Sequence, residues 1–127
     1  MFSHIVVGSN DLERSRRFYD AVFAAIGGPA GFIDDKGRLV YLKDGRVFVV
    51  TRPIDGEQAC HANGGTIGFT MATPQTVDAW QQAAVAHGGK AIEEPAGIRE
   101  APGRTMYLAY VRDPDGNKLC GVHIVTA

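Results

Sequence analysis

The sequence predicts an α+β fold made of two βαβββ modules, in which each module is a strand, a helix and three further strands. Segments with strand-like alternation and segments with helix-like spacing follow one another in this order in both halves of the chain. The 16 glycines are typical of tight turns between short elements rather than of a helical bundle. Each module alone is too small to form a stable core, so the two modules are expected to pair.

The chain length fits a single domain, residues 1–127, that contains both modules. We place the first module at about residues 1–53, a linker at about 54–64 and the second module at about 65–127. The linker is polar and contains glycine without any periodicity, which favours a loop.

In the first module, alternating apolar residues predict a strand over His4–Ser9. Asn10 and Glu13 form a capping-box pattern, which predicts that a helix begins at Asn10. Helical spacing then continues until Gly27-Gly28-Pro29, where the helix is expected to end. Three short strands should follow it, at residues 31–34, 39–43 and 47–52, and the last two are joined by an Asp-Gly hairpin turn.

The second module repeats this order. A strand is expected at residues 66–72, followed by Thr73 as the helix N-cap and Pro74 at the first helical position. The helix should stop at Gly88-Gly89. The later strands are expected at residues 90–94, 106–112 and 118–125, with a long loop at 95–104 and a tight turn at 113–116.

Charge and composition narrow the class of partner. The formal net charge is -1, with 13 Lys and Arg against 14 Asp and Glu. We therefore expect neither nucleic acid nor an anionic membrane as the main partner, because both require a concentrated positive field. The N-terminus carries no leader pattern and no apolar run is long enough to span a bilayer, so we expect a cytoplasmic protein. Cys60 and Cys120 are expected to be free thiols.

Two segments resemble the vicinal-oxygen-chelate superfamily, which comprises glyoxalases, bleomycin resistance proteins and extradiol dioxygenases. Residues 4–19 are similar to its opening strand and helix, in which a His starts the strand and D-L-x-x-S-x-x-F-Y follows. Residues 111–119 are similar to its closing D-P-D-G-N hairpin. Both segments occur in the right order at the right ends, and with the repeat they cover nearly the whole chain.

The resemblance implies that the paired modules form a cupped mixed sheet with the helices on its outer face. It also implies a cavity within the cup and a homodimer, which would cover exposed sheet edges and an apolar concave face. Enzymes of the family hold a divalent metal in this cup with four ligands from four strands, and the metal acts as a Lewis acid.

Carried onto this sequence, the four ligand positions mostly lack metal-binding side chains. His4 matches the first position, whereas the others fall on Val49, Thr66 and Cys120, where the family has His or Glu. One matching ligand is too few for a conventional site, so no metal ligand set is assigned and a divalent metal is disfavoured.

His4 and Cys120 are the two candidate catalytic residues. His4 either presents its imidazole to the cavity as a hydrogen-bond donor or general base, or is a structural residue at the start of a strand. Cys120 is either a nucleophile or soft ligand opposite His4, or a small buried apolar residue. His61, in the central loop, is a surface residue or an additional ligand.

Strand alternation predicts a mostly neutral, apolar cavity lining with a few hydroxyls, which suits a small organic ligand. Arg52, Arg99 and Arg104 are either at its rim or on the solvated surface. The predicted lining comprises Val6, Gly8, Val49, Thr51, Thr66, Gly68, Thr70, Cys120 and Val122, with a phenol from Tyr107 or Tyr110.

Three functions are compatible with these residues. The preferred hypothesis is a glyoxalase-like protein that binds or transforms a small organic molecule without a conventional metal. The alternatives are a metal-dependent lyase, isomerase or dioxygenase, and a drug-binding protein like the bleomycin resistance members, whose ligand is cationic. The net charge of -1 gives this last hypothesis no particular support.

Overall fold

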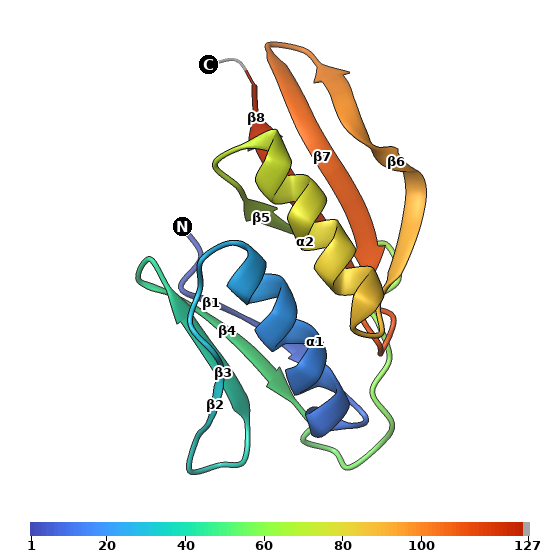
Figure 1. Cartoon of the computed structure of the whole chain (residues 1–127). Helices are drawn as coiled ribbons and strands as arrows, with labels where there is room; N and C mark the ends of the chain where they lie inside the picture. Colours follow the sequence, from blue (N-terminus) through green and yellow to red (C-terminus); the bar gives the residue numbers. More distant parts are fainter. Residues whose placement is uncertain (126–127) are drawn as a thin grey trace.

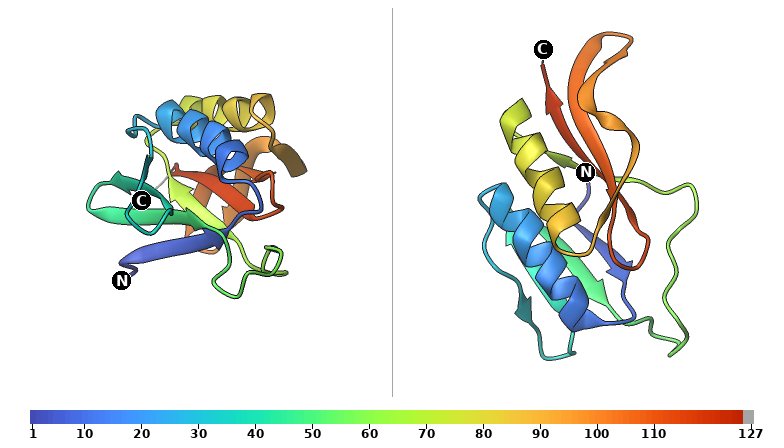
Figure 2. Two further views of the ribbon diagram at one scale, coloured as in Figure 1. Left: turned by 90° about the horizontal axis from the view of Figure 1, so that it is seen from below. Right: turned by 45° about the vertical axis from the view of Figure 1, so that its right-hand side comes forward.

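The structure is a computed structural model that describes residues 1–125. It contains two four-stranded mixed sheets and two helices, arranged as the predicted α+β fold. The two helices lie side by side on one side of the molecule, with the strands beneath them (Figures 1 and 2).

The first module forms one sheet in the order β1-β4-β3-β2. Strand β1 pairs with β4 in parallel, whereas the other neighbours are antiparallel. Helix α1 connects β1 to β2. The elements are β1 (His4–Gly8), α1 (Leu12–Ala25), β2 (Phe32–Ile33), β3 (Leu39–Lys43) and β4 (Arg46–Thr51).

The second module repeats this topology, with the order β5-β8-β7-β6 and a parallel pair between β5 and β8. The sequence repeat therefore corresponds to a structural repeat. The elements are β5 (Ile67–Thr70), α2 (Pro74–Ala86), β6 (Lys90–Ala101), β7 (Arg104–Arg112) and β8 (Lys118–Ile124).

The two helix starts differ from each other in how well the sequence predicted them. Thr73 is the N-cap of α2 and Pro74 begins the helix, as predicted. The predicted N-cap of α1, Asn10, is wrong by one residue: the Asp11 carboxylate accepts the N–H of Arg14. The Asn10 side chain instead exchanges two hydrogen bonds with the backbone of Ala59, and so ties the central loop to the start of α1.

The predicted loop at residues 95–104 is also wrong. Strand β6 continues to Ala101 and pairs with β7 on both sides of a register shift between Ile92 and Gly97. Pro95 lies within this register shift, where its nitrogen, which carries no hydrogen, is not required to donate to the neighbouring strand. Glu93, also within the shift, has a φ of 60°. The long edge of β7 thus pairs with a segment whose own sequence indicated a loop.

The core lies between the helices and the adjacent faces of both sheets. Phe18, Tyr19 and Trp80 are fully buried. Aromatic contacts join the two modules, because the Phe69 ring of β5 lies 5.6 Å from that of Phe48 in β4 and 5.5 Å from that of Phe23 in α1.

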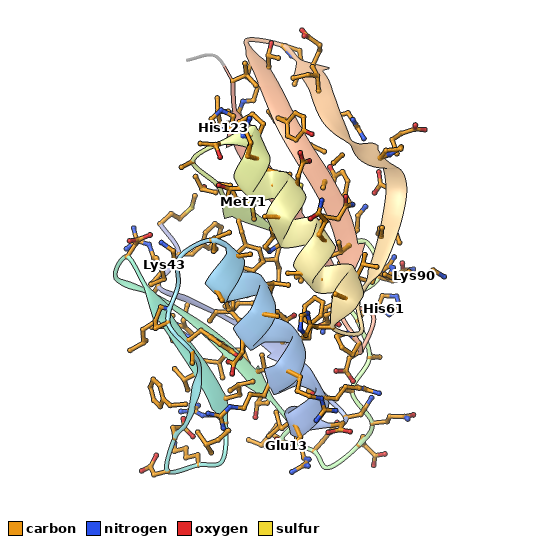
Figure 3. All side chains as sticks on the ribbon, in the orientation of Figure 1. Glu13, Lys43, His61, Met71, Lys90 and His123 are labelled. Atoms are coloured by element: carbon orange, nitrogen blue, oxygen red, sulfur yellow. The ribbon has the colours of Figure 1, made fainter. Side chains whose placement is uncertain are left out.

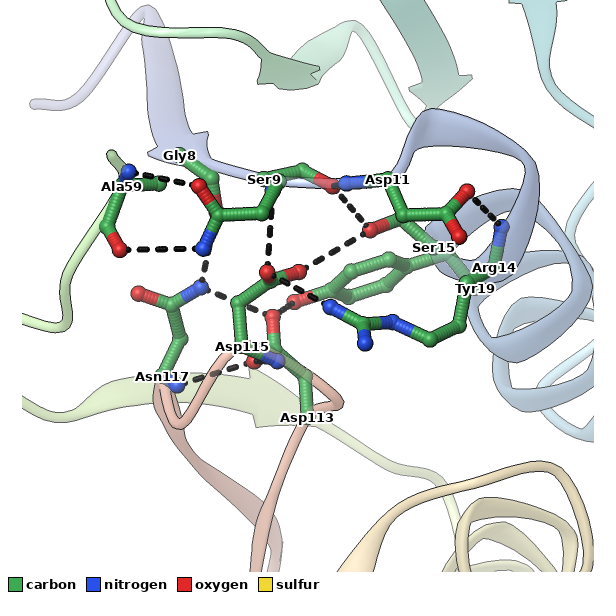
Figure 4. Close-up of polar contacts among 11 residues, drawn as sticks. Gly8, Ser9, Asp11, Arg14, Ser15, Tyr19, Ala59, Asp113, Asp115 and Asn117 are labelled. Carbon is green, nitrogen blue, oxygen red and sulfur yellow. Dashed lines mark hydrogen bonds and ion pairs between the residues drawn. The ribbon is translucent and has the colours of Figure 1, made fainter. Parts of the chain in front are cut away.

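A buried polar network connects α1 to the turn between β7 and β8 (Figure 4). The Tyr19 hydroxyl donates to Asp113 Oδ2 at 2.6 Å, and the Asn117 amide donates to the same oxygen at 2.8 Å. The Asp115 carboxylate accepts from Arg14 at 2.9 Å. Burial raises the pKa of Tyr19, and burial also raises the pKa of Asp113 although its hydrogen bonds oppose this shift. The D-P-D-G-N turn therefore fastens the second module to the first helix.

Within the part of the chain that the structure describes, neither helix combines the length and the apolar character needed to cross a membrane.

Candidate functional site

The two candidate catalytic residues share no hydrogen bond among residues 1–125. His4 is exposed at the start of β1, where its Nδ1 lies 2.7 Å from the Ser3 hydroxyl. Cys120 is buried in β8, and the hydrogen-bond partner of its thiol is the Gly121 carbonyl, at 3.9 Å. Hence each side chain has a partner other than the second candidate residue.

The Cys120 environment favours the neutral thiol. Burial raises the pKa of Cys120, and the nearby Tyr110 hydroxyl opposes this effect only in part. A reactive thiolate needs a neighbour that lowers the thiol pKa overall. This environment therefore matches the structural interpretation of Cys120 better than the nucleophilic one.

The donor set does not fit the metal centre that the family resemblance implies. Among residues 1–125, no three His, Cys, Asp or Glu side chains converge closely enough to hold a metal ion. Val49 is buried in β4, and Thr66 precedes β5. His4 is the single imidazole at the four expected positions, and we derive no chemical step through a metal.

The predicted cavity lining is distributed over several places. Thr70 lines a cavity of about 440 Å³ together with His4. Val6 and Thr66 line a smaller hollow of about 270 Å³. The linings of these two cavities do not include Val49, Thr51, Val122 or Cys120.

The prediction for Tyr107 is wrong. Its hydroxyl donates to Asp78 Oδ1 in α2 at 2.7 Å, so the ring lies on the face of the second sheet that the helix covers. Tyr110 lies three residues further along β7, opposite Cys120, and this odd separation places it on the opposite face of the sheet. The sequence did not show which residues of β7 face the helix, because this depends on how β7 pairs with its neighbouring strand.

The larger cavity lies at the junction of the two modules, beyond the last turn of α1. One wall of the cavity is the face of the first sheet that packs against α1. Helix α1 covers most of this face, and the cavity lies over the part that the helix does not reach. On that face Phe48 pairs with both Ile5 and Tyr41 across the strands, and all three residues line the cavity. The helix ends at Ala25, so the hairpin between β3 and β4 extends beyond its cover.

The second module supplies the opposite wall. Gly68, Phe69 and Thr70 of β5 line the cavity, and Phe23 of α1 lines its inner end. The rings of Phe23, Phe48 and Phe69 lie 5.5–5.6 Å from one another with near-perpendicular planes. The cavity thus has an aromatic interior built from both modules.

Polar groups are concentrated at the hairpin end of the cavity. Lys43 and Arg46 form a cross-strand pair in the register of β3 and β4, and both line the cavity. Lys43 lies at this end of the first sheet (Figure 3), and its ammonium is 3.0 Å from the Asp44 carboxylate. The Tyr41 hydroxyl already donates to Asp20 at 2.7 Å, and burial raises the pKa of Tyr41, so this phenol is not an available base.

Sequence reasoning missed this aromatic and cationic set. Alternation assigns the relevant residues to the opposite strand face from His4 and Val6, and the sequence alone associates that face with the helix-covered core. The signal that could have found it is strand alternation, because Lys43 follows Tyr41 by two residues and Arg46 precedes Phe48 by two, so these charges share a strand face with the two rings.

The fold and this junction cavity define a paired-module α+β protein with a small-molecule-sized site. Comparison with protein families matches residues 1–120 to the Glyoxalase/Bleomycin resistance protein/Dioxygenase superfamily. The chain therefore belongs to this superfamily.

Solved structures are similar over nearly the whole chain. A glyoxalase/bleomycin resistance protein from Albidiferax ferrireducens T118 has 46% sequence identity and a TM-score of 0.92, covering 96% of this chain and 98% of its own. A glyoxalase-related enzyme from Fulvimarina pelagi has 23% identity and a TM-score of 0.71, with coverages of 97% and 87%.

A lactoylglutathione lyase from Agrobacterium tumefaciens has 18% identity and a TM-score of 0.65, with coverages of 97% and 92%. At this identity, the similarity shows the fold alone. No protein of curated function matched the sequence.

Proposed function

We propose that this glyoxalase-superfamily protein binds or transforms a small organic molecule in the junction cavity, without a conventional divalent metal. The observation that carries the proposal is the cavity itself. Its volume of about 440 Å³ falls within the range of about 300–1,000 Å³ that is typical of small-molecule sites. Its lining is mainly aromatic and aliphatic, with a few polar groups gathered at one end.

The donor chemistry supports the metal-independent form of this proposal. A catalytic metal needs about three fixed protein ligands and an open position. His4 supplies one imidazole, while Val49 and Thr66 supply no ligand of the kind the family uses. Burial disfavours the thiolate of Cys120, which is the form that would bind a metal.

If the bound molecule is transformed, His4 is the residue to which we assign proton transfer or hydrogen bonding. It lines the cavity and is exposed, so its imidazole is accessible to a ligand. Imidazole is also the side chain best suited to proton transfer near neutral pH.

The first experiment is elemental mass spectrometry of tag-free protein, combined with a thermal-shift screen of divalent metals on the same sample. The proposal expects substoichiometric metal and no metal-dependent rise in melting temperature. Near-stoichiometric Zn, Fe, Mn or Ni that also raises the melting temperature would overturn it in favour of a lyase or dioxygenase. The variant His4→Ala separates these outcomes further, because it should leave the metal content unchanged if His4 is not a ligand.

A homodimer in the cytoplasm is part of the same proposal. Phe32, Leu42 and Val6 are each 46–49% exposed. The strand register places all three on the face of the first sheet that points away from α1, which gives a second copy an apolar surface to cover. A monomeric mass in sedimentation equilibrium at working concentration would count against it, and Leu42→Lys is expected to weaken the association.

A further inference from the structure

The junction cavity combines an aromatic interior with a cationic end, and this combination limits the ligand chemistry. We propose that its ligand is a small aromatic anion, whose ring packs against the exposed edge of the Phe23, Phe48 and Phe69 cluster and whose carboxylate is held by Arg46. This inference rests on the proposed function, because it assumes that the cavity takes a small molecule.

The aromatic cluster favours a planar body. The three rings meet at centroid distances of 5.5–5.6 Å and interplanar angles of 70–81°. Phe23 and Phe48 are 6% and 7% exposed and Phe69 is half-buried, so an aromatic ligand meets the exposed edge of this cluster. Aromatic pairs gain stabilisation beyond their buried area. An aromatic ligand therefore uses this lining better than an aliphatic ligand of equal size.

The charged row lies next to the aromatic row on the same sheet face. Arg46 precedes Phe48 by two residues in β4, and Lys43 follows Tyr41 by two residues in β3, so each pair shares one face of the sheet. Two residues along a strand span about 7 Å. A ring that packs on Phe48 thus brings its attached carboxylate within reach of the Arg46 side chain.

The charges at this end leave one cation for a ligand. The Asp44 carboxylate is paired with Lys43 at 3.0 Å. Arg46 is exposed, and it takes part in no side-chain hydrogen bond or ion pair among residues 1–125. A guanidinium binds a carboxylate through two parallel hydrogen bonds, a geometry that a lysine ammonium does not offer.

Lys43 and Arg46 are not required to neutralise the C-terminal end of helix α1. Its C-terminal carbonyls would attract positive charge, but the N–H groups of Gly27 and Gly28 already donate to the carbonyls of Ala24 and Phe23. With two side-chain cations against one carboxylate at this end, the site repels a cationic ligand. The inference therefore separates this cavity from the cationic-drug alternative.

The test compares three probes of nearly equal shape: 2-naphthoate, 2-naphthylmethanol and 2-naphthylmethylammonium. Binding to the full chain is measured by calorimetry, and the site is located from amide shifts of Gly28, Gly68 and Phe69 in heteronuclear NMR. We expect the anion to bind about tenfold more tightly than the neutral alcohol, the size of one charge-assisted hydrogen bond. The cationic probe should bind most weakly.

Variants assign this preference to the guanidinium. Arg46→Gln should abolish most of the tenfold preference while leaving the affinity for the alcohol within about twofold. Arg46→Lys should restore only part of it, because the ammonium lacks the bidentate geometry. The matched control is Arg17→Gln, which removes the same charge from an exposed position on α1 outside the cavity lining and should change neither affinity.

The outcomes distinguish the two proposals. Equal binding of anion and alcohol at the cavity, or an anion preference that survives Arg46→Gln, would overturn the anionic assignment and leave the junction cavity as a small-molecule site. A preference for the ammonium probe would overturn it in favour of the cationic-drug alternative. If none of the three probes shifts the cavity amides at millimolar concentration, this inference fails, whereas the proposed function is overturned by a near-stoichiometric metal that raises the melting temperature.

Discussion

Replacing Tyr19 with Phe tests whether the buried network at the β7–β8 turn stabilises the pairing of the two modules. The substitution removes one hydroxyl, which is fully buried and donates to Asp113 Oδ2 at 2.6 Å. Asp113 keeps three other donors, namely the N–H groups of Asp115 and Asn117 and the side-chain amide of Asn117. The network should therefore weaken without collapsing.

The expected loss in the free energy of unfolding is about 2 kcal/mol, because hydrogen bonds to charged groups contribute about 1.5–3 kcal/mol. The assay is urea denaturation at neutral pH, followed by circular dichroism. The matched control is Tyr107→Phe, which removes a hydroxyl bound to Asp78 at 2.7 Å near the protein surface and should lose less than about 1 kcal/mol.

The pH dependence gives an independent check of the same contact. The pKa of Asp113 is raised in the folded state by burial, so its ionisation costs stability as pH rises from 3.8 through the folded-state pKa. The Tyr19 hydroxyl lowers this pKa, so its removal should raise the pKa further. The difference in stability between the native protein and Tyr19→Phe should therefore grow as pH rises through this window and shrink in acid. A loss below about 0.5 kcal/mol, or one that does not change with pH, would refute the reasoning.

Three further predictions concern the second module and the two thiols. Gly121→Ala should cost about 1–3 kcal/mol in denaturation, because its Cβ would lie 2.7 Å from Met71 Cε and 2.9 Å from Trp80 Cε3. Gly68→Ala, where a Cβ meets no atom within 4 Å, is the control, and equal losses would contradict the packing argument. Thr73→Ala should lower stability by about 1 kcal/mol through loss of the α2 N-cap, and a neutral result would mean that the Thr76 N–H finds water as an equivalent partner. In thiol labelling of the native protein, Cys60 should react rapidly and Cys120 only on unfolding, whereas fast labelling of Cys120 would restore it as a candidate nucleophile.

The local elements were accessible from the sequence because their signals are local. Helical spacing, the Thr73-Pro74 start and the Asp-Gly hairpin turn each act over a few residues, and the βαβββ repeat follows from their order. The side chains at the four family ligand positions could also be read directly, with His4 the single match.

The partner of each strand and the place of the cavity required the tertiary structure. Residues 95–101 have no clear alternation, and they become a strand because β7 offers an edge to pair with across a bulge. Tyr107 was placed on the wrong face of its sheet. Alternation shows which residues of a strand share a face, but only the neighbouring strand and helix show which of the two faces is covered.

The site lies between modules that are far apart in the chain, and periodicity carries no information about that packing. The sequence by itself determined the elements, their order and the chemistry of the expected ligand positions. The tertiary structure alone decided that α1 stops short of the β3–β4 hairpin and that Phe69 lies opposite Phe48. An apolar strand face is core where a helix covers it and cavity where the helix has ended, and this difference depends on packing in space rather than on residue type.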